Sequence, residues 1–176
     1  ALGKDISVWA GSRMYRGDDI YLLDFWPLDE QNTVGGGIRY VLGKTAFDLH
    51  AGFNQLDDDF QFQEVMVEAE SFGTRSVVYM NRQRLVVSAR AEHHEDLFDT
   101  VSGKAIVYSE FHHIGEGRTV DEQQLQETLP ADSGILVGAE VGLYEKGTPN
   151  FLNLFIRLGQ GLAAFDELGV PYGLNT

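Results

Sequence analysis

Cysteine is absent from this 176-residue sequence, which excludes disulfides and thiolate metal sites. Basic residues are few: 13 Lys and Arg stand against 27 Asp and Glu, and the formal net charge is −14. Because contact with phosphate backbones needs a basic surface, we expect no nucleic-acid partner. No apolar run approaches the roughly 20 residues of a membrane-spanning helix. A helical membrane protein is therefore excluded, whereas a membrane β-barrel, whose strands only alternate in polarity, is not.

Polarity alternates with a period of two along much of the chain. In the segment "TAFDLHAGFN" at 45–54, one face holds Thr45, Phe47, Leu49, Ala51 and Phe53, and the other holds Ala46, Asp48, His50, Gly52 and Asn54. This alternation is typical of a strand with one apolar and one wet face. The segments 84–92, 135–144 and 151–161 follow the same rule. Glycine is also frequent, at 20 of 176 residues, which suits tightly coiled strands.

These patterns predict a single all-β domain, an antiparallel meander. Further strands are expected at 5–13, 36–42, 74–80 and 104–112. Short turns are expected at 42–45 and 81–83, and longer connections at 54–64, 93–103, 114–133 and 145–149. Only 18–26 and 120–128 hint at helix. Short turns alternating with long connections predict a meander with one plain end and one elaborate end.

The alternation alone leaves two architectures open. A soluble sandwich turns its apolar faces to a core and its polar faces to water. A transmembrane barrel turns its apolar faces to lipid and its polar faces to a lumen. The wet faces here combine small and charged residues, as in Gly138, Glu140 and Gly142, which slightly favours a crowded aqueous lumen.

Other motifs carry little chemistry. "GGGIRYVLGKT" has Ile38 where a phosphate-binding loop needs glycine, and a strand rather than a helix should follow it. The acidic run at 56–60 could hold calcium, and the histidine pairs in 92–96 and 111–117 could hold a transition metal. A solvated loop and polar strand ends are the favoured explanations. We therefore expect no metal and no cofactor. We also expect no enzymatic activity, because no serine or cysteine nucleophile has a recognisable setting.

The stretch "WAGSRMYRGDDIYLLDFW" at 9–26 mixes rings and charges more densely than the rest of the chain. It could be a surface lid packed on the sheet by its apolar side. It could also be a segment folded into a pore, with rings on the wall and charges facing the passage. Sugars suit the second surface, because their C–H faces stack on aromatic rings and their hydroxyls need polar partners.

This stretch resembles the corresponding segment of the maltoporins, the LamB-type carbohydrate porins of bacterial outer membranes. The shared frame is W-A-G-x-R-x-Y, followed by Asp19 and then by Asp24, Phe25 and Trp26. The next segment, "GGGIRYVLGKTAFDLHAGFN", resembles the strand, Gly-Lys turn and strand that follow in that family. The segment 134–161 resembles a later strand pair more weakly.

The resemblance implies an outer-membrane porin that passes maltodextrin-like or other small sugars by facilitated diffusion. It implies a single β-barrel segment over 1–176 with an inward-folded constriction loop at about 16–35, in which Arg16, Asp19, Asp24 and Trp26 contact the sugar. Gly17 stands where the family has a constriction arginine, so either the neighbouring Arg16 takes over that role or the constriction here is less basic. The resemblance also implies contact with outer-membrane lipid and a homotrimer.

The length of the chain bears on whether it can form a complete barrel, and one alternative architecture stays open. Complete porins of this type have about 16–18 strands, so we expect the chain to be a processed segment of a longer porin that does not close a barrel alone. The rival is a soluble or surface β-sandwich or small barrel that binds carbohydrate. The late strand separates the two hypotheses: Leu152, Leu154, Ile156 and Leu158 should face lipid in a porin and fill a packed core in the rival.

Overall fold

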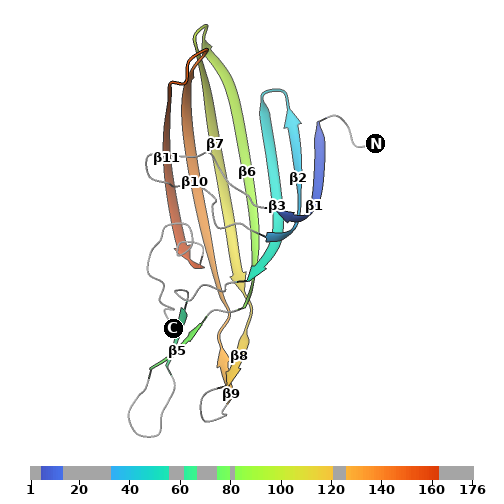
Figure 1. Cartoon of the computed structure of the whole chain (residues 1–176), viewed down its shortest axis with the longest axis vertical. Helices are drawn as coiled ribbons and strands as arrows, with labels where there is room; N and C mark the ends of the chain where they lie inside the picture. The colour runs from blue at the N-terminus through green and yellow to red at the C-terminus, as the bar shows by residue number, and fades with distance from the viewer. Residues whose placement is uncertain are drawn as a thin grey trace.

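The computed structural model describes residues 5–13, 33–55, 62–66, 75–79, 82–120 and 126–162. Seven antiparallel strands form one sheet in the order β1-β2-β3-β6-β7-β10-β11 (Figure 1). We call this sheet the wall. Two small hairpins, β4–β5 and β8–β9, form separate two-stranded sheets. The wall strands are β1 (Ile6–Arg13), β2 (Thr33–Leu42), β3 (Thr45–Gln55), β6 (Gln83–Phe98), β7 (Val101–Ile114), β10 (Asp132–Glu145) and β11 (Phe151–Gly161); the hairpin strands are β4 (Phe62–Met66), β5 (Arg75–Tyr79), β8 (Gly117–Val120) and β9 (Gln126–Leu129).

The alternation of side chains gives the wall two chemically different faces. Cross-strand register places Phe47 opposite Ala91 and Tyr40 on one face, which we call the outer face. It places Asp48 opposite Arg39 and Arg90 on the other, which we call the inner face. A slip of one residue would exchange the two sets, so the hydrophobic pattern fixes the register. The predicted faces of 45–54 are confirmed.

The two ends of the wall differ in their connections. At one end, uppermost in Figure 1, short turns at 43–44, 99–100 and 146–150 join the strands; we call it the short-turn end. At the other end the connections are 14–32, 56–82 and 115–131, and the two small hairpins belong to these; we call it the long-connection end. A plain end and an elaborate end are thus present as predicted, but the connections at 93–103 and 145–149, which were expected to be longer, are short turns of the plain end. No described residues form a helix long and apolar enough to cross a membrane.

Several predicted boundaries are wrong. The strand expected at 74–80 is present as β5, but it pairs with β4 outside the wall, and β6 pairs directly with β3. The expected long connection at 93–103 is mostly strand, because β6 and β7 continue to a two-residue turn at 99–100. Of the helical hint at 120–128, Val120 belongs to β8 and residues 126–128 belong to β9, so these positions are strand, whereas 121–125 lie outside the described residues. The hint at 18–26 lies outside the described residues.

Glycines on the inner face accommodate large neighbouring rings. A Cβ atom added to Gly138 would lie 2.2 Å from Cζ of Tyr108, which is directly opposite on β7. A Cβ added to Gly37 would lie 2.6 Å from Nε1 of Trp9, opposite on β1. The rings therefore lie flat over glycines of the adjacent strand. This packing accounts for part of the high glycine content.

We expect Gly138→Ala to lower the free energy of unfolding of the porin by about 1–2 kcal/mol, because the new methyl overlaps the Tyr108 ring and forces it to move. Urea unfolding followed by tryptophan fluorescence measures this loss. The same change made together with Tyr108→Ala should cost less than the sum of the two single changes. Additive costs would show that the ring does not press on this position.

Candidate functional site

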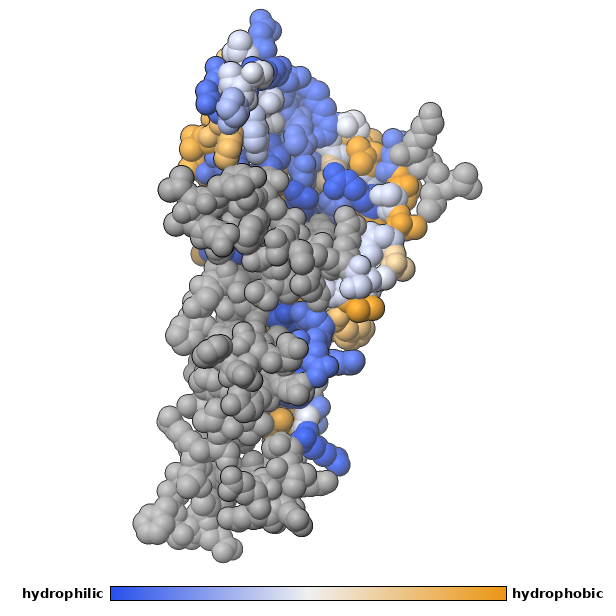
Figure 2. All heavy atoms as spheres, in the orientation of Figure 1, coloured by the Kyte–Doolittle hydropathy of each residue, from blue (hydrophilic) through white to orange (hydrophobic). Residues whose placement is uncertain are grey.

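The wall buries polar residues and exposes apolar ones. On the inner face His50, Arg84, Glu110 and Glu140 are all at most 4 % exposed. On the outer face the predicted late-strand set is between 53 % and 66 % exposed: Leu152, Leu154, Ile156 and Leu158. Hydrophilic residues also dominate the described surface near the short turns in Figure 2, with hydrophobic patches along its margins. A soluble sandwich would bury the apolar face and expose the polar one, so the burial of the inner face and the exposure of the outer face argue against the rival carbohydrate-binding module.

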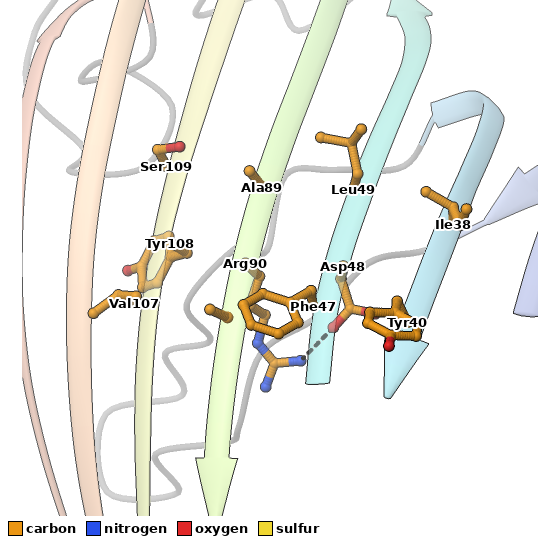
Figure 3. A pocket seen from close by; sticks show the side chains of 11 residues that line it. Ile38, Tyr40, Phe47, Asp48, Leu49, Ala89, Arg90, Val107, Tyr108 and Ser109 are labelled. Carbon is orange, nitrogen blue, oxygen red and sulfur yellow. Dashed lines mark ion pairs between the residues drawn. The ribbon is translucent and has the colours of Figure 1, made fainter. Parts of the chain in front are cut away.

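A row of alternating charges crosses the inner face on β2, β3 and β6. The Arg39 guanidinium Nη1 donates to both carboxylate oxygens of Asp48, at 3.1 and 2.9 Å. Arg90 Nη1 lies 3.8 Å from the Asp48 carboxylate on the other side, the pair dashed in Figure 3, and Arg90 also contacts Glu92. His94 contacts Glu92 in turn. Each carboxylate has a basic partner, so the row presents fixed hydrogen-bonding groups with little net charge.

A second group combines rings with cations on β7, β10 and β11. Lys104 Nζ lies 3.7 Å from the Glu140 carboxylate and 5.3 Å from the centre of the Tyr144 ring. The Arg157 guanidinium lies 5.8 Å from the centre of the Phe155 ring. Both distances are within the range of cation–π attraction. The inner face therefore offers a flat apolar surface beside charged groups, which is the combination that a sugar ring requires.

His50 organises a third inner-face cluster. Its Nε2 is 2.8 Å from the Thr33 hydroxyl, and its Nδ1 is 3.4 Å from the Ser88 hydroxyl. The Trp9 ring stacks on the imidazole with 5.5 Å between centroids and 12° between planes. These contacts join β1, β2, β3 and β6 close to the ends of β1 and β2 between which the connection 14–32 runs. The cluster fixes the geometry of the wall at the base of that connection.

Buried polar residues also line the long-connection end. His112 Nε2 lies 3.1 Å from the Glu110 carboxylate, and both side chains are fully buried. Arg84 Nε donates to the side-chain carbonyl of Asn54 at 2.9 Å. Arg82, just before β6, donates to the backbone carbonyls of Gly115 and Pro130 at 2.7 and 3.0 Å. Burial lowers the pKa of Arg82, and the nearby Asp132 carboxylate opposes this shift.

The four predicted sugar-contacting residues, Arg16, Asp19, Asp24 and Trp26, lie outside the described residues. The structure describes the two strands that flank them: β1 ends at Arg13, β2 begins at Thr33, and the two strands pair along their length. Residues 33–35 of the predicted constriction segment belong to β2. The segment between them therefore begins and ends at the long-connection end of one hairpin.

The candidate metal positions are not assembled in the described residues. Within the ranges that the structure describes, no group of three or more His, Asp or Glu side chains could hold a metal ion. His93 and His94 lie near the short-turn end of β6, whereas His112 and His113 lie near the long-connection end of β7. The run at 56–60 is outside the described residues.

An antiparallel wall with an apolar outer face, a polar inner face, short turns at one end and long connections at the other is the arrangement of part of a transmembrane β-barrel of the outer-membrane type. Among the described strands β1 and β11 do not pair, so the wall is open, as expected for a segment of a longer porin. The LamB porin family profile matches residues 1–173, and the chain belongs to that family. No curated protein and no solved structure matches the chain. It is a porin of the bacterial outer membrane that passes sugars, and as a member of a channel family it is not an enzyme.

Proposed function

We propose that this wall forms part of a channel for facilitated diffusion of maltodextrin-like oligosaccharides. The observation that supports this most directly is the pairing of rings with cations on the inner face, at Tyr144 with Lys104 and at Phe155 with Arg157. A sugar sliding over these residues exchanges stacking and hydrogen bonds in small steps. Weak contacts repeated along a passage permit flow, whereas one tight site would stop it.

The connection 14–32 is the proposed constriction. Arg16, Asp19 and Asp24 would exchange hydrogen bonds with sugar hydroxyls, and Trp26 would stack on the sugar ring. The support is the resemblance of this segment to the maltoporin constriction and its departure from the wall beside the His50 cluster. Charged and aromatic residues at a narrow point select for polar, ring-shaped solutes.

Liposome swelling tests the constriction. The porin that carries this chain is reconstituted, and the entry rates of a maltodextrin series are compared with that of a small amino acid. We expect Trp26→Ala and Asp24→Ala to slow maltodextrin entry while leaving amino-acid entry unchanged. Leu28→Ala, in the same segment but without a polar group or ring, is the matched control. Equal maltodextrin rates in all variants would contradict the proposed constriction.

Charge is distributed unevenly between the wall strands and the rest of the chain, and this predicts ion preference. The segments 14–32, 56–82, 115–131 and 162–176 hold 17 of the 27 acidic residues but only 4 of the 13 basic ones. The remaining residues, with 10 acidic and 9 basic, are nearly neutral. The wall strands that flank these segments end at the long-connection end, and acidic residues near one mouth of a pore would raise the local cation concentration. We therefore expect the channel to prefer potassium over chloride, as measured by the reversal potential in a KCl gradient.

That preference should depend on the long connections rather than on the short turns. Changing the three aspartates at 57–59 to asparagine should shift the reversal potential towards zero, and the shift should shrink at 1 M salt because screening shortens to about 3 Å. The matched control is Glu145→Gln at the short-turn end, which we expect to change little. A larger shift for the control would contradict the assignment.

We also propose that the porin assembles as a homotrimer. One support is the family resemblance. The other is a row of small residues across the outer face of β1, β2 and β3, in which Ala10, Gly36 and Ala51 lie side by side. Small residues allow a neighbouring wall to approach closely. Native mass spectrometry of the porin in mild detergent tests this proposal: a trimer mass is expected, and a monomer as the sole species would contradict it.

A further inference from the structure

A groove of about 540 Å³ runs along the outer face over β6 (Figure 3). Its sides are large side chains of β2, β3 and β7, and its floor on β6 is alanine. Register places Ala91 between Phe47 and Val107, and Ala89 between Leu49 and Ser109. The groove therefore exists because β6 has methyl groups where β3 has Phe47 and Leu49 and β7 has Val107. Most of its lining is apolar: Ile38, Tyr40, Phe47, Leu49, Ala89 and Val107.

The groove opens towards polar residues at the short-turn end. In the next row, the Thr45 hydroxyl lies 2.8 Å from Nδ1 of His93. Lys44 donates to the Glu95 carboxylate beside them, and both side chains are about half exposed. Lys44 carries its charge at neutral pH, and this hydrogen bond raises the pKa of the Lys44 ammonium further. A positive and a negative group thus lie together where the apolar groove ends.

The position of the groove in the membrane indicates which lipid leaflet contacts it. Outer-membrane barrels have short turns on the periplasmic side, so the open end of the groove lies at the inner-leaflet interface. Acyl chains lie against the apolar part of that leaflet, and headgroups lie at its edge. Tyr40, 40 % exposed on the groove's side, is the residue type found in aromatic belts at such interfaces.

We propose that this groove binds one phosphatidylethanolamine molecule of the inner leaflet, with an acyl chain in the groove and the headgroup against Lys44, His93 and Glu95. Lys44 and His93 would face the phosphate, and Glu95 would accept hydrogen bonds from the ammonium group. Charges of both signs match a zwitterionic headgroup better than an anionic one. The proposal extends the barrel assignment, and it does not depend on which solute passes through the channel.

Bromine quenching of a tryptophan placed in the groove tests this. Val107→Trp adds a reporter to the groove, and Val141→Trp is the matched control, because Val141 is similarly exposed on the same face but outside the groove. The porin is reconstituted in phosphatidylcholine with a small fraction of phosphatidylethanolamine brominated on its acyl chains. We expect at least twofold stronger quenching at 107 than at 141. Equal quenching at both positions would overturn the proposal.

Two further variants separate lipid from other occupants. With the Val107→Trp reporter, Ala91→Leu fills the floor of the groove and should remove the excess quenching, and Lys44→Ala with Glu95→Ala should weaken it. Brominated phosphatidylglycerol, which lacks the ammonium, should quench less than the phosphatidylethanolamine. If Ala91→Leu instead changes the subunit number and leaves quenching unaltered, the groove is a subunit contact and the proposal is wrong. Conductance measured on the same samples reports channel function independently.

Discussion

Replacing Ile156 by arginine should lower the free energy of unfolding of the porin in lipid by about 2–4 kcal/mol, the cost of Arg on the lipid face near the bilayer midplane. Ile156 lies at the middle of β11, is 63 % exposed on the outer face, and has Ala139 opposite it on β10. A guanidinium at this depth loses its water and finds no partner in hydrocarbon. Denaturant unfolding in phospholipid vesicles measures the change.

The same strand supplies a depth control. Gln160 also lies on the outer face, but near the end of β11, opposite Ile135. Gln160→Arg should cost no more than about 1 kcal/mol, since arginine near an interface reaches water and headgroups. Leu154→Arg should also destabilise the porin. If Ile156→Arg and Gln160→Arg cost the same, the outer face does not meet the hydrocarbon core.

Removing the central carboxylate of the inner-face charge row should have the second-largest effect. Asp48→Ala leaves the Arg39 guanidinium without its two hydrogen bonds, and Arg90 keeps only Glu92. Hydrogen bonds to charged groups contribute about 1.5–3 kcal/mol, so we expect a loss of that size in the free energy of unfolding. Denaturant unfolding in vesicles measures it, and the channel should also become less cation-preferring.

A double-mutant cycle isolates the interaction. Arg39→Ala alone removes one partner, and Arg39→Ala with Asp48→Ala removes both. The double variant should be more stable than the sum of the single losses predicts, because it leaves no unpaired guanidinium at position 39. Additivity would show that the two side chains contribute separately and that the row is not a connected network.

The faces of the wall strands were predictable from the sequence. Phe47 and Leu49 alternate with Asp48 and His50, and a period of two needs no knowledge of neighbouring strands. The exposed late-strand leucines were also predicted. The sequence motif from Trp9 to Trp26, which includes Asp19, indicated a maltoporin-type porin. The match of the LamB porin family over residues 1–173 confirms this prediction. The roles of Arg16, Asp19, Asp24 and Trp26 remain predictions.

The pairing of charges across strands was not predictable. It depends on which strands are neighbours, and a wall strand at 74–80 would have separated Asp48 from Arg90. Residues 75–79 have strand propensity, but β4 satisfies their hydrogen bonds outside the wall. Similarly, the polar residues at 93–96 indicated a loop, whereas paired strands continue there, as in the cross-strand contacts of His93 and Glu95 with Thr45 and Lys44. The polarity of a segment therefore does not show where a strand ends.

Single-channel conductance of the porin that carries this chain, recorded in a planar bilayer with maltodextrins of increasing length, tests the sugar channel most directly. We predict steady ohmic conductance in KCl and saturable block by maltodextrins, with affinity that rises with the number of glucose units as more inner-face contacts are made. Sucrose provides a comparison sugar. Ohmic conductance that no sugar reduces at any concentration would contradict the sugar channel while leaving the barrel intact.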